Sequence, residues 1–290
     1  MQKFSLHTHT IGFDGHNSEE EMLAQATTLG WSHIGFSNHF IVHPQIKEAP
    51  MYQYALKGGY NNIYSSSFDE AIAKFEPHYQ KIDELRQITD IKILKGMEVD
   101  YFATPEWQEG FAKAIKHLKP DYLIGAAHFI LYNDTLYNSH DVKNSTKLEQ
   151  NQLIHRYWQN ERATAQSGLF TFMAHLDLIK KVGLGQEDIW AEEEAKTIKT
   201  LKHSGVMVEL NTSYYKFGDE PYPSCRIQQM LSQANIPVLL SDDAHYASQL
   251  GNKFAEAQIL AQQNGISNFY QLKSSYSPVS GICHNKSLVK

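Results

Sequence analysis

Cysteine, long apolar runs and clustered basic residues are all scarce in this chain of 290 residues. The two cysteines, Cys225 and Cys283, have no C-x-x-C spacing and do not make a disulfide framework. No apolar run is long enough to span a membrane, and the first residues lack the cationic and apolar regions of a signal peptide. These absences favour a reduced, cytoplasmic protein.

Positive charge is limited as well. The formal net charge is −6, and lysine and arginine are scattered rather than gathered in a stripe or a tail. A surface for nucleic acid is therefore not indicated. We expect no nucleic-acid or membrane partner, and a monomer or homodimer that acts on a small molecule. Length and a hydrophobic content of 42% suit one globular domain, which we expect to cover residues 1–290.

Histidine is abundant, with 15 residues, and its positions follow a pattern. His7 and His9 come at the end of a short apolar run. Side chains alternate faces along a strand, so the two imidazoles project from the same side and could form the first half of a metal site. The alternative is a pair of polar residues that cap an edge strand.

Seven short apolar runs alternate with segments of helical periodicity. The expected strands lie near residues 4–6 and at 33–37, 91–94, 122–127, 169–174, 206–210 and 236–240. Helices are expected at 18–30, 68–86, 104–118, 148–166, 188–203, around 227–231 and at 253–264. This alternation predicts an α/β fold with a parallel sheet that closes into a distorted seven-stranded (β/α)7 TIM-like barrel.

Polar side chains that bind metals follow six of the seven expected strands. They are His7 and His9, His39, Glu98, His128, His175, and Asp243 with His245. The strand ends of such a barrel meet at one face, so we expect a shared metal site there. Imidazole and carboxylate suit Zn, Mn or Fe, and so many ligands suit two or three ions bridged by Glu98. Such ions can deprotonate water near neutral pH, which favours hydrolysis, above all at phosphorus.

Residues 40–66 are expected to be irregular and are rich in aromatic side chains. A long loop at the ligand end of a sheet is often a lid or a substrate wall. The alternative is a surface excursion that is packed by its own tyrosines.

These motifs resemble, in order and across nearly the whole chain, the polymerase and histidinol phosphatase (PHP) superfamily. Three further segments look like its histidinol-phosphate phosphatase branch: Glu98-Val-Asp100-Tyr101, His175-Leu-Asp-Leu-Ile-Lys-Lys181 and Glu220-Pro-Tyr-Pro-Ser224. The resemblance implies a distorted seven-stranded barrel with a three-metal site. It also implies hydrolysis of L-histidinol phosphate to L-histidinol and phosphate, a step of histidine biosynthesis.

The resemblance implies ligand sets too. One ion would be held by His7, His9, Glu98 and Asp243, a second by Glu98, His128 and His175, and a third by His39, His245 and a residue of the first loop. Asp14 and His16 both fit that last position. Asp14 matches the more widespread spacing, and His16 could instead support the ligands or contact phosphate. Asp243 or His245 could protonate the leaving alkoxide.

One segment departs from the branch. Relatives carry an arginine after the stretch that corresponds to Asn211-Thr-Ser213, whereas this chain has Tyr214-Tyr215-Lys216. Lys216 would offer phosphate a point charge without the bidentate grip of arginine. The other candidates for phosphate are Arg156, Arg162, Lys180 and Arg226, each with a structural ion pair as the commoner alternative.

Three rival functions remain open. The first is another PHP phosphoesterase, which would act on nucleotides, sugar phosphates or nucleic acid. The second is an amidohydrolase, but that family usually bridges its metals through a lysine on the fourth strand, where this chain has His128. The third is a non-catalytic metal-binding protein, which the full set of strand-end ligands disfavours.

Overall fold

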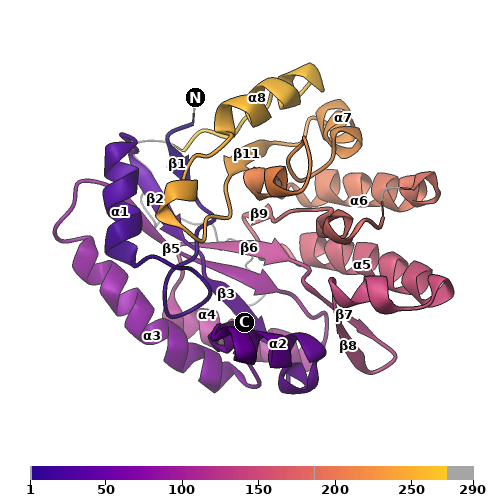
Figure 1. The fold of residues 1–290 in the computed structure, drawn as a ribbon, viewed down its shortest axis with the longest axis horizontal. Helices are drawn as coiled ribbons and strands as arrows, with labels where there is room; N and C mark the ends of the chain where they lie inside the picture. Colours follow the sequence, from indigo (N-terminus) through magenta and orange to yellow (C-terminus); the bar gives the residue numbers. More distant parts are fainter. Residues whose placement is uncertain (1, 186, 273–290) are drawn as a thin grey trace.

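The computed structural model describes residues 2–185 and 187–272, which form a curved sheet with helices on its outside (Figure 1). The strands are β1 (Phe4–Ser5), β2 (His33–Phe36), β3 (His39–Val42), β4 (Tyr64–Ser65), β5 (Lys92–Asp100), β6 (Tyr122–Ala126), β7 (Phe129–Tyr132), β8 (Thr135–Asn138), β9 (Phe172–Met173), β10 (Met207–Asn211) and β11 (Val238–Ser241). The α-helices are α1 (Glu19–Thr28), α2 (Pro50–Gly58), α3 (Phe68–Leu85), α4 (Pro105–Leu118), α5 (Lys147–Gln166), α6 (Ala191–Ser204), α7 (Cys225–Ala234) and α8 (Phe254–Gln263). Within the described residues, none of the helices is both long and apolar enough to cross a bilayer.

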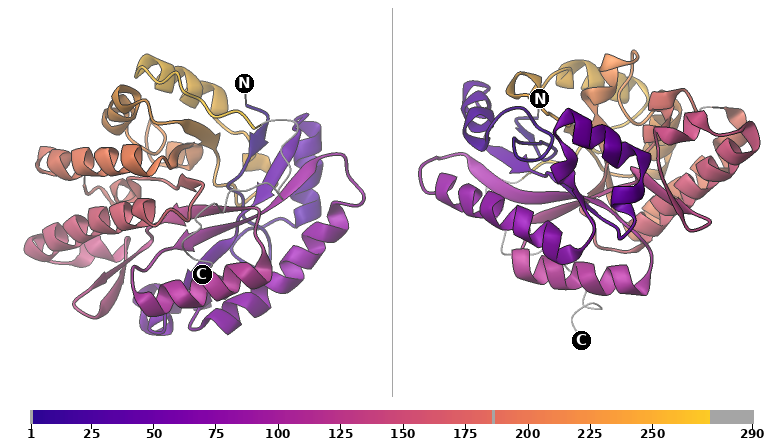
Figure 2. Two further views of the ribbon diagram at one scale, coloured as in Figure 1. Left: turned by 180° about the vertical axis from the view of Figure 1, so that it is seen from behind. Right: turned by 60° about the horizontal axis from the view of Figure 1, so that its bottom comes forward.

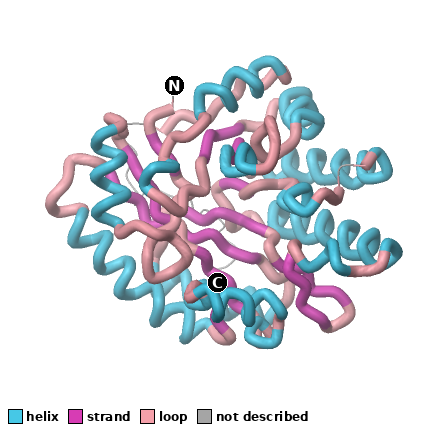
Figure 3. The backbone as a smooth tube through the Cα atoms, viewed as in Figure 1, coloured by secondary structure: helices cyan, strands magenta, loops and turns pink. Residues whose placement is uncertain are grey.

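Seven strands form the barrel in the order β1-β2-β5-β6-β9-β10-β11. Each neighbouring pair along this path is parallel. The helices lie outside the strands in all views (Figures 2 and 3). The prediction of a distorted seven-stranded α/β barrel is therefore confirmed.

The barrel closes between its first and last strands through one short junction, which we call the seam. Thr8 and Ala244 form an isolated parallel bridge there. The backbone N–H of His9 donates to Ala244 O at 2.9 Å. Farther down, the side-chain amide of Gln2 donates to Leu240 O at 2.7 Å. The seam therefore places the first barrel strand, β1, next to the last one, β11, together with the candidate metal ligands that follow each of them.

A small apolar core fills the barrel below the strand ends. It comprises Phe4, Leu6, Leu94, Tyr122, Ile124, Ala126, Phe172, Ala174 and Leu239. The hydroxyl of Tyr122 donates to Leu6 O at 2.6 Å. A Cβ atom at Gly35 or Gly96 would lie 2.2 Å from an atom of the Tyr122 side chain, so both glycines are needed for this close approach. The filled interior gives the strand-end residues a rigid floor.

Two parts of the fold differ from the sequence prediction. Residues 40–66 are not irregular, because they contain β3, α2 and β4, and β3 pairs with both β4 and β5. The antiparallel hairpin β7–β8 was not predicted. Asn133 and Asp134 at its turn have positive φ of 48° and 58°, which matches the backbone of a type I′ hairpin turn.

Candidate metal centre

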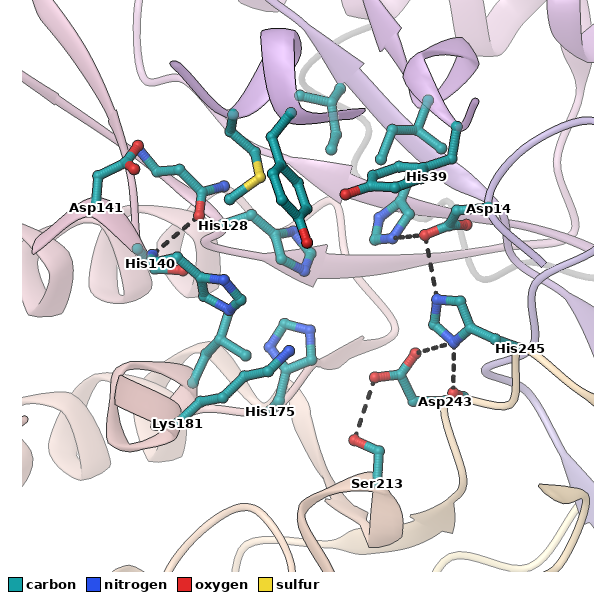
Figure 4. A pocket seen from close by; sticks show the side chains of 18 of the residues that line it. Asp14, His39, His128, His140, Asp141, His175, Lys181, Ser213, Asp243 and His245 are labelled. Carbon is teal, nitrogen blue, oxygen red and sulfur yellow. Dashed lines mark hydrogen bonds and ion pairs between the residues drawn. The ribbon is translucent and has the colours of Figure 1, made fainter. Parts of the chain in front are cut away.

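Nine imidazole and carboxylate side chains meet where the barrel strands end, and Figure 4 shows those that face the pocket, among them His39, His128 and His175. We call them the histidine–carboxylate cluster: His7, His9, Asp14, His39, Glu98, His128, His175, Asp243 and His245. They come from the end of β1, the loop after it, the start of β3, strand β5, and the segments that follow β6, β9 and β11. His175 and Asp243 have positive φ, 21° and 49°, a strained backbone that is often found at functional sites.

Glu98 is at the centre of the cluster and its carboxylate is 1% exposed. Five imidazoles surround its two oxygens. Oε2 lies 3.3 Å from His7 Nε2, 3.6 Å from His9 Nε2 and 2.8 Å from His39 Nδ1. Oε1 lies 3.5 Å from His128 Nε2 and 2.9 Å from His175 Nε2. One carboxylate therefore faces ligand atoms from both sides of the barrel mouth, as a bridging group must.

Two aspartates complete the ring on the seam side. Asp243 Oδ1 lies 3.0 Å from His9 Nε2. Asp14 Oδ2 lies 3.2 Å from His39 Nε2 and 3.1 Å from His245 Nε2. Asp14 is thus the first-loop residue that the fold brings to the cluster.

His16 has a different position. Its side chain is exposed, and its ring stacks on Tyr246 with 4.1 Å between the ring centroids. Only its backbone touches the cluster, because its N–H donates to His245 O at 2.8 Å. The geometry therefore favours Asp14 over His16 as the first-loop ligand, which stays a prediction.

Buried polar atoms without hydrogen-bond partners show that the cluster suits a cation. They include His7 Nε2, both ring nitrogens of His9, Asp14 Oδ1, His39 Nδ1, Glu98 Oε2 and His175 Nδ1. Leaving such atoms without hydrogen bonds inside a protein is costly, and bound cations would satisfy them. Three overlapping groups among the described residues have ligand atoms close enough for one ion: His9-Asp14-His39-His245, His7-His9-Asp243 and His39-Glu98-His128.

The charges in the cluster stabilise one another. Burial alone would raise the pKa of Glu98, but the imidazoles of His39, His7 and His128 outweigh it and hold that pKa well below its usual range. Burial would lower the pKa of His39, and here Glu98 and Asp14 outweigh it and raise the pKa well above 6.5. Glu98 therefore remains an anion that is available to positive charge.

A second layer of carboxylates orients the histidines. Glu209 on β10 lies 2.8 Å from His7 Nδ1 through Oε2, and its Oε1 accepts the backbone N–H of His175 at 2.7 Å. Asp100 Oδ2 lies 2.8 Å from His128 Nδ1. Partners of this kind fix the ring and turn its other nitrogen toward a metal. Sequence reasoning did not single out Glu209, although a glutamate within the apolar run 206–210 was a signal for it.

A cavity of about 720 Å³ opens above the cluster. One wall comes from the 40–66 segment through Met51, Tyr54, Tyr60 and Tyr64, and another comes from residues 138–144 after the hairpin. The aromatic segment thus lines the pocket, as expected for a substrate wall. Its closure as a lid stays a prediction.

Only one of the basic residues predicted to bind phosphate lines this cavity, and it is Lys216. Lys180 is buried and donates to Glu220 Oε1 at 3.1 Å and to Pro221 O at 2.8 Å. The three predicted arginines do not line the pocket and contact other parts of the protein instead: Arg156 contacts Leu131 O, Arg162 contacts Glu193, and Arg226 contacts Glu194 and Asp188. The fold therefore does not bring Lys180, Arg156, Arg162 or Arg226 to a ligand in the pocket.

Lys181 was not proposed from the sequence as a site residue. It nevertheless lies where a phosphate-binding basic residue was expected, on the wall of the cavity. It lines the cavity beside His175 and His140 (Figure 4). Burial lowers its pKa, and no carboxylate in the described part of the chain lies within ion-pair distance of it. Burial and the charge of Lys181 also lower the pKa of His140 to about 4, so that ring is neutral. Lys181 is thus a cation on the cavity wall that forms no ion pair with any of the described residues, and its Nζ lies 5.4 Å from the centroid of the Phe217 ring.

Comparisons with known proteins agree with this geometry. Residues 5–213 match the family described as PHP domain. The chain is 26% identical over 254 residues to a protein of Deinococcus radiodurans named "Probable histidinol-phosphatase", covering 87% of this chain and 89% of that protein. A Schizosaccharomyces pombe protein with the same name is 23% identical over 290 residues, covering 93% of this chain and 89% of that protein.

A solved structure has the same fold. It is the histidinol phosphate phosphatase of Lactococcus lactis, solved with zinc, L-histidinol and phosphate. The TM-score is 0.64 at 16% identity, over 94% of this chain and 97% of that one.

Proposed function

The chain belongs to the PHP domain family, and from that membership we propose that it is a metal-dependent phosphomonoesterase that hydrolyses L-histidinol phosphate to L-histidinol and phosphate. The observation that carries the proposal is the position of Glu98, whose two oxygens face five imidazoles on the floor of an open cavity. The names of the two relatives and the ligands of the Lactococcus lactis structure support the choice of substrate.

The proposed cofactors are two or three divalent ions, Zn, Mn or Fe. Their proposed ligands are the nine members of the histidine–carboxylate cluster, with Glu98 shared between ions. When bound, such ions lower the pKa of water and offset charge on phosphoryl oxygens. The donor set fits them, because it joins imidazole and carboxylate without thiolate.

Basic and hydroxyl groups of the pocket are suited to hold the phosphoryl group. Lys181 and Lys216 line the cavity, and both act on it as point charges. Ser213 also lines the cavity, and its hydroxyl donates to Asp243 Oδ2 at 3.3 Å. These three side chains orient the ester so that the alcohol points away from the cluster.

With two ions bound, His245 would be free of metal, and it is then the proposed proton donor to the leaving alkoxide. Its Nδ1 lies 2.9 Å from the carbonyl oxygen of Asp243, which can only accept, so Nδ1 carries a proton. Burial would lower the pKa of this imidazole, but Asp14 outweighs burial and raises it. His245 is 27% exposed to the pocket and can therefore reach a substrate oxygen. Asp243 is the alternative donor.

The test is phosphate release from L-histidinol phosphate and from a generic aryl phosphate, on protein whose metal content has been counted. We expect a strong preference for L-histidinol phosphate and two or three ions per chain. Turnover of the aryl phosphate without that preference would keep the reaction class and reject the histidinol assignment. Protein that carries its ions and releases phosphate from neither compound would contradict the proposal.

A further inference from the structure

The cavity above the cluster has carboxylates on two opposite sides. Three line it, and two of these, Asp14 and Asp243, belong to the histidine–carboxylate cluster. The third, Asp141, lies on the far side of the pocket from Asp14 and His245 (Figure 4). Among residues 2–185 and 187–272, Asp141 is the one cavity-lining carboxylate outside the cluster. It is therefore available to a ligand while the cluster holds ions.

Backbone hydrogen bonds fix Asp141 relative to the cluster. The N–H of Ser139 donates to the carbonyl oxygen of His128 at 2.8 Å, which ties the end of the hairpin to the end of β6. The N–H of His140 then donates to Asn138 Oδ1 at 2.9 Å, and the N–H of Asn138 donates to Asp141 Oδ2 at 3.3 Å. One carboxylate oxygen is thus held by the turn, and Oδ1 has no hydrogen bond within the part of the chain described. A group positioned in this way needs little reorganisation on binding.

Among the residues that the structure describes, no cation forms an ion pair with Asp141, although the charge of Lys143 acts against the effect of burial on its pKa. Lys143 lines the same cavity, but it is exposed and makes no ion pair with Asp141 within 4.0 Å. Burial raises the pKa of Asp141, a cost that an arriving cation would remove.

Tyr64 is the aromatic side chain of the cavity wall whose ionisation responds to this carboxylate, and it lines the cavity together with Met51. Burial raises the pKa of Tyr64 far above its usual value, and the charges of Asp14 and Asp141 add to the effect, so the phenol stays neutral. A neutral aromatic face beside a carboxylate attracts a positively charged group and excludes an anion.

We infer that Asp141, with Tyr64, forms a subsite for the cationic amino group of the substrate. The inference rests on the proposed function and deepens it. The phosphoryl group lies at the cluster with Lys181 and Lys216, and the ammonium lies at Asp141. The preferred substrates are therefore phosphomonoesters of amino alcohols, and sugar phosphates and nucleotides, which lack an ammonium at that position, are poor ones.

The test compares Asp141→Asn with the matched control Asp134→Asn. Asparagine keeps an oxygen for the Asn138 N–H and loses the charge. Asp134 is an exposed acid in the turn of the same hairpin. We measure kcat/KM for L-histidinol phosphate and O-phosphoethanolamine, and for p-nitrophenyl phosphate and glycerol phosphate. The decisive quantity is the ratio of kcat/KM for the two amino compounds to kcat/KM for the two compounds without an amino group. Asp141→Asn should lower this ratio by about tenfold, mainly by raising KM for the amino compounds. Asp134→Asn should leave the ratio unchanged. An unchanged ratio in Asp141→Asn would overturn the inference.

A second measurement separates this inference from the proposed function. L-histidinol, which has the amino group and no phosphate, is titrated calorimetrically into the metal-loaded wild-type protein and both variants. About tenfold weaker binding in Asp141→Asn alone supports the subsite, and equal binding to all three proteins overturns it. If the wild-type protein hydrolysed no phosphomonoester at all, the proposed function would fail, and the titration would still decide the role of Asp141.

Discussion

At the scale of single residues, Glu98 is the side chain whose charge the cluster depends on most. Glu98→Gln keeps the shape of the side chain and removes the charge that faces five imidazoles. We expect the metal content to fall by at least one ion per chain and phosphate release to fall by about a hundredfold or more. Metal analysis and initial rates on the same preparation check this. Glu106→Gln, an exposed residue at the start of α4, is the control. Full metal content with full activity in Glu98→Gln would contradict a bridging role.

The protons on His7 and His39 set the pH dependence of ion binding. Burial would lower both pKa values, but the carboxylates of Glu209 and Glu98 outweigh burial for His7, and those of Glu98 and Asp14 do so for His39. Both pKa values therefore stand well above 6.5. Below these raised values the imidazoles are protonated, so an incoming ion must displace protons.

We therefore expect the affinity for divalent ions to rise as the pH increases through and above 6.5, with protons released on binding. Metal titrations of the ion-free protein at a series of pH values, in buffers of different ionisation enthalpy, measure both quantities. An affinity that stays constant between pH 6 and pH 8 would show that these imidazoles are not ligands.

At the scale of elements, the short 3-10 helix η4 (Leu178–Val182) places two consecutive lysines in opposite environments. Lys180 is buried, contacts Glu220 and lies 4.2 Å from the ring centroid of Tyr214. Lys181 faces the cavity. Lys180→Met should lower the free energy of unfolding by about 3 kcal/mol, because it leaves Glu220 without its cation. Lys181→Met should instead raise KM for phosphomonoesters by about tenfold.

Urea unfolding and steady-state kinetics on both variants separate the two effects. Adding Glu220→Gln to Lys180→Met should recover part of the lost stability, since the unpaired carboxylate is then removed. If Lys180→Met changed KM and Lys181→Met changed stability, the assignment of the two side chains would be reversed.

The same helix shows why the sequence predicts some of the site and not the rest. Strand ends in a parallel barrel converge whatever the loops do, so His7, Glu98 and His175 could be brought together from their positions alone. Which of Lys180 and Lys181 reaches the cavity depends on the rotation of one short helix. That rotation is set by packing against Tyr214 and Tyr222, which are distant in sequence.

The elements missed within 40–66 have a related cause. Strand β3 is only four residues long and owes its pairing to β5, where His39 lies opposite Glu98. No periodicity of period two is visible in so short a run, and tertiary contacts decide its conformation. The hairpin β7–β8 did carry a local signal, since Asn133-Asp134 is a sequence that tolerates positive φ.

At the scale of the whole molecule, ions at the cluster would connect strands from every part of the barrel. Their proposed ligands follow or belong to β1, β3, β5, β6, β9 and β11. Ions that bind the folded chain alone stabilise it by mass action, at about 2.7 kcal/mol for each ion present at a hundred times its dissociation constant. Removing two or three ions with a chelator should therefore lower Tm by roughly 10 °C.

Scanning calorimetry with and without chelator checks this, and restoring the divalent ion should restore Tm. In Glu98→Gln the chelator should have a smaller effect, because fewer ions are bound at the start. A chelator that removes the ions and leaves Tm in place would show that they contribute nothing to the closure of the barrel.

The seam has a consequence for the order of events when the chain is made. His7 and His9 are synthesised well before Asp243 and His245, which lie against them across the bridge of Thr8 and Ala244. Seven of the nine cluster residues precede β11, and only Asp243 and His245 follow it. The full set of donors therefore comes into being only when the final strand docks, so an ion that needs Asp243 or His245 can be loaded only after β11 has been made.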